Sequence, residues 1–157
     1  MLNVIPRPTA RVLLFDPQDR LLLFHVFGLS MPYLWITPGG GKEAHETLED
    51  AAMRELWEET GQQTAVELGP MVWYREHCWE KRGQVFRSEE HFFVARTCSL
   101  SVTIHDQREA ADILGWRWWR LNELRQSDQI FAPRRLPDLL GPLLRGTIPD
   151  APIDVGI

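Results

Sequence analysis

The chain has 157 residues, of which 44% are hydrophobic and 25% are charged, and its formal net charge is −5 at pH 7. These values are ordinary for a globular chain and predict one domain over residues 1–157, while they leave the oligomeric state open. The absence of a long basic run argues against a protein that binds nucleic acid non-specifically, although a nucleotide needs only a local cationic pocket.

The N-terminal segment and the cysteines bear on location. Residues 1–15 place Pro6 and Pro8 before a short apolar run, without the charged start and small-residue cleavage site of a signal peptide. No apolar run is long enough to span a membrane, so we expect no membrane partner. Cys78 and Cys98 lack the spacing of a metal site. We therefore expect a cytoplasmic protein whose two cysteines are reduced and buried.

The first part of the chain predicts three strands followed by a glycine-rich loop. In chain order we expect a strand at 9–15, a turn at 16–19, a strand at 20–27, a loop at 28–33 and a strand at 34–36. The first two strands form a β-hairpin, because valine, leucine and phenylalanine dominate both and a proline sits in the turn between them. Three glycines then follow Pro38, and glycine lets a ligand approach the backbone closely.

A helix is predicted to begin at Thr47 and to end before Gly61. Thr47 is a good N-cap with Asp50 in the capping position, and Gly61 is a residue type that commonly terminates helices. An apolar stripe recurs every four residues, at Leu48, Ala52 and Leu56. This stripe would pack on a sheet while the neighbouring acidic face points to a cleft.

The rest of the chain predicts more strands than helices. We expect a strand at 65–74 that extends toward 79, a turn at 81–83, a strand at 84–96, an extended segment at 99–106, a strand at 113–119, a short helix at 121–125, and a helix at 133–145 before an extended tail. The last helix is identified by leucines at helical spacing, and it tolerates Pro137 only in its first turn.

Three carboxylates stand together on the first predicted helix. Glu55, Glu58 and Glu59 are spaced i, i+3 and i+4, which places them on one face within about one turn. Clustered carboxylates repel one another unless a cation lies between them. Hard oxygen ligands suit Mg²⁺, or Mn²⁺ as the alternative ion, and such ions commonly act together with substrate phosphates. The spacing therefore indicates a metal-dependent enzyme that acts on phosphates.

The segment at 40–62 resembles the Nudix box, G-x5-E-x7-R-E-U-x-E-E-x-G-U, in which U is a bulky apolar residue. The matching positions are Gly40, Glu46, Arg54, Glu55, Leu56, Glu58, Glu59 and Gly61, and Gln62 departs from the apolar residue expected last. The resemblance implies an α/β fold, in which a mixed β-sheet is sandwiched between helices. It also implies Mg²⁺-dependent hydrolysis of a phosphoanhydride bond in a nucleoside diphosphate linked to another group.

The resemblance further assigns roles within the box. Glu58 and Glu59 are the first metal ligands, and Glu55 is either a third ligand or the base that orients the attacking water. Glu46 either ligates the ion or fixes the loop through Arg54, whose role is structural. Gly40 contributes its backbone, and its carbonyl oxygen is a candidate ligand of the metal ion.

Outside the box the candidates for substrate binding are weaker. Glu90, or its neighbour Glu89, is a candidate general base, and Arg11 is a candidate phosphate contact together with Arg7 and Arg75. Trp73 and Trp79, with Tyr74, are candidates to stack on a flat group of the substrate. The alternative function is a catalytically weak module of the same fold that senses a nucleotide. The substrate stays open among oxidised nucleotides, nucleotide sugars, dinucleoside polyphosphates and capped RNA.

Overall fold

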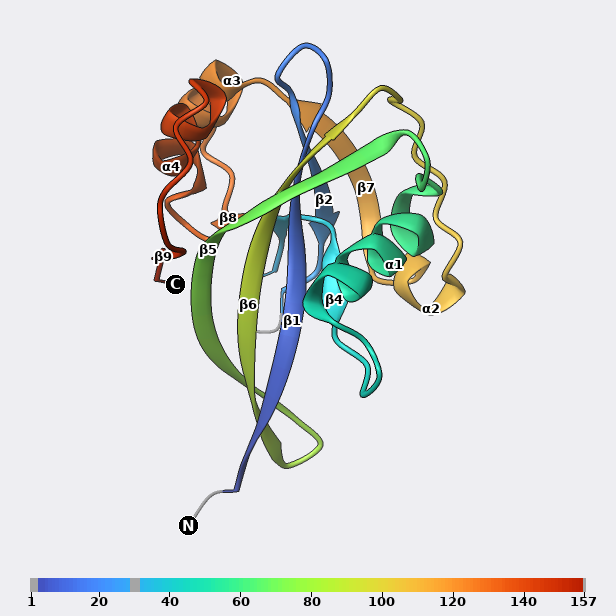
Figure 1. Cartoon of the computed structure of the whole chain (residues 1–157). Coiled ribbons are helices and arrows are strands. Elements are labelled where there is room, and N and C mark those ends of the chain that lie inside the picture. The colour runs from blue at the N-terminus through green and yellow to red at the C-terminus, as the bar shows by residue number, and fades with distance from the viewer. Residues whose placement is uncertain (1–2, 29–31, 157) are drawn as a thin grey trace.

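A computed structural model of the chain describes residues 3–28 and 32–156, and Figure 1 shows it as a ribbon. The helices are α1 Leu48–Thr60, α2 Gln107–Ala110, α3 Leu121–Gln126 and α4 Leu136–Leu144. The strands are β1 Val4–Phe15, β2 Leu21–Val26, β3 Leu34–Ile36, β4 Gly39–Gly41, β5 Val66–Lys81, β6 Gln84–Thr97, β7 Ile113–Trp119, β8 Phe131–Ala132 and β9 Ile153–Asp154.

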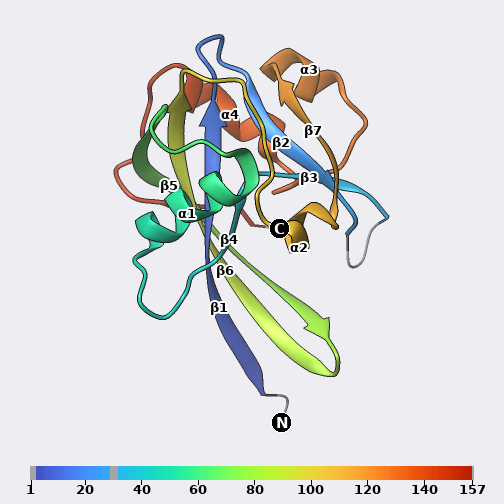
Figure 2. The ribbon, with the colours of Figure 1, turned by 90° about the vertical axis from the view of Figure 1, so that its right-hand side faces the viewer.

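The strands form one mixed sheet in the order β8-β3-β2-β1-β6-β5-β9, in which β4 also pairs with β1 and β7 with β2. Strand β1 runs parallel to β6 over its whole length, and β6 pairs with β5 as a long antiparallel hairpin. These three strands project beyond the helices as an arm, which Figure 2 shows at the lower end of the molecule. The predicted hairpin between β1 and β2 is present, with Phe15 opposite Leu21.

Helices cover both faces of the sheet because the side chains of β1 alternate between them. Ala10, Val12 and Leu14 point to one face and pack in a core cluster with Ala51, Ala52 and Leu56 of α1. Leu13 and Phe15 point to the other face and pack with the leucines of α3 and α4. Figure 1 shows α1 on one side of the sheet and α3 and α4 on the other. This arrangement confirms the expected α/β fold with a mixed sheet between helices.

Helix α1 has the ends that the sequence predicts. Thr47 is the N-cap, and its hydroxyl accepts from Asp50 N while the Asp50 carboxylate accepts from Thr47 N. Gly61 adopts φ of 73° at the C-terminal end, a left-handed conformation that glycine reaches without strain. Two reciprocal hydrogen bonds and one glycine therefore fix the length of the helix that carries the carboxylates.

Several strand limits differ from the prediction. Strand β1 begins at Val4 instead of residue 9, although Pro6 and Pro8 resemble strand breakers. Lys42 N donates to Pro8 O, and Val12 N donates to Pro38 O. The backbone N–H and C=O groups of even-numbered residues of β1 therefore point away from β6, toward the side on which β4 lies. The proline nitrogens therefore face an edge, where a missing N–H costs no sheet hydrogen bond.

The limits of three other elements also differ from the prediction. Strand β5 continues without interruption to Lys81, and residues 39–41, expected as a loop, form β4 against β1. Helix α4 begins at Leu136 instead of residue 133. Residues 29–31 of the predicted loop at 28–33 lie outside the described residues.

The thiols of Cys78 and Cys98 are free, but both residues are exposed, so the prediction of buried cysteines is wrong. Cys78 lies between His77 and Trp79 on β5, and alternation along the strand sends its side chain to the opposite, outer face. In the described part of the chain, no helix combines the length and apolarity needed to cross a bilayer.

Candidate active site

Arg54 is the centre of the acidic cluster, by which we mean Glu46, Glu55, Glu58 and Glu59. Its Nε and Nη2 donate to the two carboxylate oxygens of Glu46 at 2.7 and 2.9 Å. Its Nη1 donates to Glu55 Oε1 at 2.9 Å and to Glu58 Oε2 at 3.2 Å. Nη2 also donates to the carbonyl oxygen of Gly41 at 2.9 Å. One guanidinium thus holds three carboxylates and the backbone of β4.

Glu55 and Glu59 are the buried members of the cluster. They are 3% and 5% exposed, and they lie one turn apart on the face of α1 that meets β4. Glu59 Oε1 accepts from the backbone N–H of Gly39 at 3.0 Å. The Oε2 atom of Glu55 is buried and has no hydrogen-bond partner among the described residues. A buried carboxylate oxygen without a partner is costly, so this atom marks a position where a further ligand belongs.

The charges in the cluster influence one another. Burial raises the pKa of Glu58 above its ordinary value, and the neighbouring charge of Glu55 adds to this effect while Arg54 opposes it. The hydrogen bond from Arg54 is the main cause that lowers the pKa of Glu46. The same bond is the main cause that raises the pKa of Arg54. Glu46 is therefore satisfied by Arg54, whereas Glu58 retains a charge that its surroundings disfavour.

Strand β4 separates the acidic cluster from a basic surface. A Cβ atom on Gly40 would lie 2.3 Å from Glu55 Oε1, and one on Gly41 would lie 2.8 Å from Arg7 Nε. Successive residues of a strand face opposite sides, so the glycines let carboxylates approach from one side and a guanidinium from the other. A strand with only hydrogen side chains thus brings opposite charges close together across a single backbone.

The cluster offers donors that fit Mg²⁺ or Mn²⁺. Within residues 3–28 and 32–156, no group of three or more acidic, histidine or cysteine side chains is already gathered around one point. Arg54 accounts for this, since it draws Glu46, Glu55 and Glu58 toward its own nitrogens. The donors are carboxylate oxygens, which are hard ligands, and one of them is buried without a partner. The donor set therefore suits a hard divalent cation.

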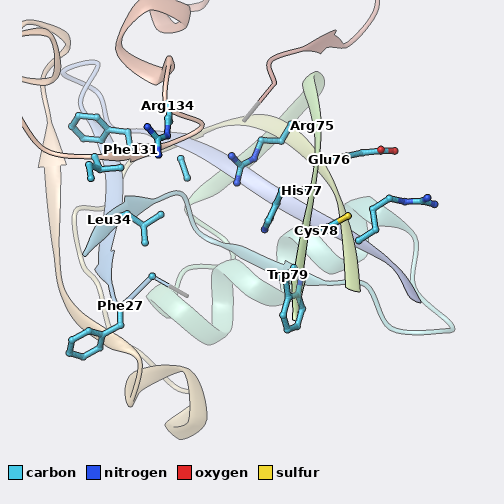
Figure 3. A pocket seen from close by; sticks show the side chains of 13 residues that line it. Phe27, Leu34, Arg75, Glu76, His77, Cys78, Trp79, Phe131 and Arg134 are labelled. Carbon is cyan, nitrogen blue, oxygen red and sulfur yellow. The ribbon is translucent and has the colours of Figure 1, made fainter. Parts of the chain in front are cut away.

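On the other side of β4, strands β1, β6 and β5 line a groove with alternating side chains. The groove side chains are Arg7, Thr9 and Arg11 from β1, Ser88 and Glu90 from β6, and Arg75, His77 and Trp79 from β5. Three adjoining cavities of about 630, 100 and 200 Å³ make up this groove, and His77 lines all of them. Figure 3 shows the largest, with Arg75, His77 and Trp79 in a row along β5.

Glu90 lies beneath the groove between two guanidinium groups. It is 2% exposed, and it accepts from Arg11 Nε at 3.2 Å and from Arg75 Nε. Burial works to raise the pKa of Glu90, but the charges of Arg11 and Arg75 outweigh burial and bring the pKa below its ordinary value. Glu90 is thus a buried, ionised residue that positions two arginines. Its expected role as a general base stays a prediction, because Glu90 also lines the smallest of the three cavities.

Glu90→Gln should lower the free energy of unfolding by about 3 kcal/mol at neutral pH, since it leaves two largely buried guanidinium groups without a charged partner. The melting temperature should fall by roughly 6–12 °C for a chain of this size. A carboxyl group whose pKa is lowered by folding stabilises the folded protein at pH values above its ordinary pKa of 4.5. This stabilisation is lost as the pH falls through the pKa of the folded state. Thermal melts from pH 7 to 3 should therefore show the two proteins converging in acid.

The control is Glu89→Gln, on the same strand but with Arg87 at 3.9 Å as its ion-pair partner and with a partly exposed side chain. That variant should melt within about 1 °C of the wild type, because such pairs contribute little. Equal destabilisation by both variants would show that Glu90 acts through general surface charge and not through a buried ion pair.

The other residues predicted to contact the substrate lie in two different places, the core and the groove. Trp73 is 2% exposed and packs in the core, so its expected role in stacking on substrate is wrong. Register shifts in β5 on the N-terminal side of Trp73 precede the straight run that carries Trp79 to the groove. Trp79 stacks on Phe86 and donates from Nε1 to Ser88 Oγ at 2.8 Å, which holds its indole beside the cavities. Arg11 lines the groove, but its Nη1 already donates to the carbonyls of residues 37 and 39.

The sequence interpretation missed His77, whose position follows from alternation with two residues that it did select, Arg75 and Trp79. Burial lowers the pKa of His77, and its Nδ1 is buried with no partner among the described residues. It also missed Phe131 and Arg134, which reach the groove from the segment before α4. No local pattern marks those two, since only the pairing of β8 with β3 brings them there.

Residues 5–139 match the model of the NUDIX domain. The chain is 32% identical over 152 residues to an RNA pyrophosphohydrolase of Caulobacter vibrioides, and the match covers 89% of this chain and 80% of that protein. It is 33% identical over 100 residues to the phosphatase NudJ of Escherichia coli, across 64% of this chain and 60% of that one. Among solved structures, a MutT protein of Methanosarcina mazei aligns with a TM-score of 0.66 at 17% identity, over 93% of this chain and 98% of that chain.

Proposed function

Since the chain belongs to the NUDIX family and is an enzyme of the pyrophosphatase type, we propose that it hydrolyses a phosphoanhydride bond in a nucleoside diphosphate linked to another group, with Mg²⁺ as its metal ion. The observation that carries this proposal is the acidic cluster beside Gly40, in which Glu55 is buried and one of its carboxylate oxygens has no hydrogen-bond partner among the described residues. The relatives named as an RNA pyrophosphohydrolase and as a phosphatase support a phosphate-containing, nucleotide-type substrate.

Each residue of the cluster has a task in this proposal. Glu58 and Glu59 hold the ion, and the free oxygen of Glu55 either completes its ligands or orients the attacking water. Arg54 keeps Glu46, Glu55 and Glu58 in place and limits their mutual repulsion. When bound, the ion neutralises phosphate charge and lowers the pKa of a coordinated water. Gly40 and Gly41 admit the diphosphate close to the backbone.

The intact carboxylates favour hydrolysis over the alternative of a nucleotide-sensing module, because a module that only senses does not need them. We also propose a cytoplasmic location. The free thiols of Cys78 and Cys98 support it, since both are exposed and a reducing compartment keeps exposed thiols in that form.

The test is a panel of oxidised nucleotides, nucleotide sugars, dinucleoside polyphosphates and 5′-triphosphorylated or capped RNA, assayed with Mg²⁺ in ¹⁸O-labelled water. We expect turnover only of compounds that contain a phosphoanhydride, with ¹⁸O in a phosphate-bearing product, because attack occurs at phosphorus. Mass spectrometry of the products reads both results. Binding of panel members without any turnover would favour the sensing module, and label in a sugar hydroxyl would refute attack at phosphorus.

A further inference from the structure

Arg75 is a buried cation whose outer nitrogens are not used by the fold. Its side chain is 8% exposed, and its Nε donates to Glu90. Neither Nη1 nor Nη2 has a hydrogen-bond partner among the described residues. Figure 3 shows this guanidinium pointing into the largest cavity of the groove, toward the side from which Arg134 and Phe131 come. A buried guanidinium that presents unused donors to a cavity is a ready site for an oxyanion.

The cavity around Arg75, which we call the Arg75 cavity, combines this cation with apolar walls. Its volume is about 630 Å³, within the usual range for small-molecule sites. Phe27, Leu34, Trp79 and Phe131 form its apolar surfaces. Glu90 carries one negative charge against Arg11 and Arg75, so the three together keep a net positive charge. Such walls suit a flat or apolar group that is joined to an anion.

The backbone of Arg75 lies three strands away from β4, the strand that borders the acidic cluster. Gly41 pairs with Thr9, Thr9 with Glu90, and Glu90 with Arg75, so these four form one row across β4, β1, β6 and β5. Three strand spacings separate the backbones at the two ends of the row by about 14 Å. A nucleotide placed across the row has its 5′ phosphates near Gly41 and the opposite side of its ribose toward Arg75.

We propose that the Arg75 cavity binds a second phosphate of the substrate, one attached to the 3′ side of the nucleoside whose 5′ side carries the scissile diphosphate. This inference rests on the proposed function, because it takes the acidic cluster as the position of the scissile bond. Arg75 is then a specificity-determining residue, with Trp79 and Phe131 beside the base or ribose. Two sources share this chemistry, namely a 3′-phosphorylated mononucleotide and the first nucleotide of an RNA chain.

The first experiment measures binding without metal and without turnover. Isothermal titration compares adenosine 3′,5′-bisphosphate with adenosine 5′-monophosphate. We expect the 3′-phosphate to tighten binding to the wild type by roughly tenfold to a hundredfold, as charge-assisted hydrogen bonds do. In Arg75→Met the two ligands should bind equally, whereas Arg75→Lys should keep part of the difference. Arg96→Met is the matched control, since Arg96 is exposed and pairs with Asp19, and it should keep the full difference.

Equal binding of both ligands to the wild type overturns the proposal, whatever the variants do and whether or not they fold. A full difference that persists in a folded Arg75→Met protein overturns the assignment to Arg75. Melting curves of each variant establish that it is folded before the titration is interpreted.

The second experiment separates the two sources with Mg²⁺ present. It compares kcat/KM for adenosine 5′-triphosphate, the same compound with a 3′-phosphate, and a 5′-triphosphorylated dinucleotide. A preference for both extended compounds supports a site for the phosphate itself, and a preference for the dinucleotide alone supports the phosphodiester of an RNA end. Equal values for all three overturn the proposal. If none is hydrolysed, the proposed function fails for these substrates, while the titrations still decide the Arg75 cavity.

Discussion

Gly40→Ala should lower turnover by about a hundredfold and change the melting temperature little. The new Cβ atom would lie 2.3 Å from Glu55 Oε1 and 2.6 Å from its carboxyl carbon. That carboxylate is the end of a side chain, so it can move. The movement would break its hydrogen bond with Arg54 and would shift the oxygen Oε2, which has no partner among the described residues. A displacement of this size at a reacting group commonly costs about a hundredfold in rate. Parallel measurements of kcat and of thermal unfolding check this.

Two other glycines separate this effect from general damage. In Gly39→Ala the Cβ atom would lie 2.2 Å from the carbonyl oxygen of Ala10, at a φ of 147° that side chains rarely adopt, so the fold itself should be destabilised. In Gly115→Ala the Cβ atom meets no described residue within 4 Å, so stability and turnover should stay near the wild-type values. Full turnover in Gly40→Ala would show that the position of Glu55 does not matter for catalysis.

The features that the sequence predicts well are local. The limits of α1 depend on Thr47, Asp50 and Gly61, which lie within or next to the helix they fix. The three carboxylates share a face because helical geometry alone sets their spacing. Arg54 reaches Glu58 one turn away for the same reason. Contacts of this kind need no knowledge of which strands pair.

The features that the sequence does not predict depend on pairing between distant segments. Glu90 reads as an exposed strand acid until β1 and β5 place Arg11 and Arg75 on either side of it. Trp73 and Trp79 look equivalent in sequence and share a face of β5, because no register shift lies between them. Only Trp73 packs with the leucines of α4 in the core, whereas Trp79 lines the groove. Burial of a charged residue becomes intelligible only when its partners across the sheet are known.

The same reasoning applies to the groove. Arg75, His77 and Trp79 alternate along β5, and this period of two predicts a shared face but not which face is open. Helices α3 and α4 pack over the hydrophobic part of that face and leave the arm uncovered, which Figure 2 shows. The cavity therefore exists because the covering helices end before this part of β5. No sequence motif in β5 indicates where those helices end.

Glu58→Gln should lower turnover by roughly two to three orders of magnitude, the usual cost of losing an electrostatic group that acts in the transition state. The same variant, without metal, should melt no lower than the wild type at neutral pH. Burial and the charge of Glu55 raise the pKa of Glu58, so the folded protein disfavours its ionised form. A carboxyl group whose pKa is raised by folding stabilises the folded protein at pH values below its ordinary pKa of 4.5. This stabilisation is lost as the pH rises through the pKa of the folded state. The neutral glutamine avoids a repulsion of about a few tenths of a kcal/mol per pair.

Melting curves of both proteins, with and without Mg²⁺ at pH 7 and without it at pH 4, test this reasoning beside one activity assay. Mg²⁺ should raise the melting temperature of the wild type, because it binds only the folded cluster, and this rise should shrink in Glu58→Gln. Any metal-free advantage of the variant should diminish at pH 4, because the raised pKa of Glu58 favours its protonated form there. Glu49→Gln, in the exposed first turn of α1, should leave turnover and the Mg²⁺ effect intact. Strong metal-free destabilisation of Glu58→Gln would make Glu58 a structural acceptor for Arg54, and an unchanged Mg²⁺ effect would put the ion elsewhere.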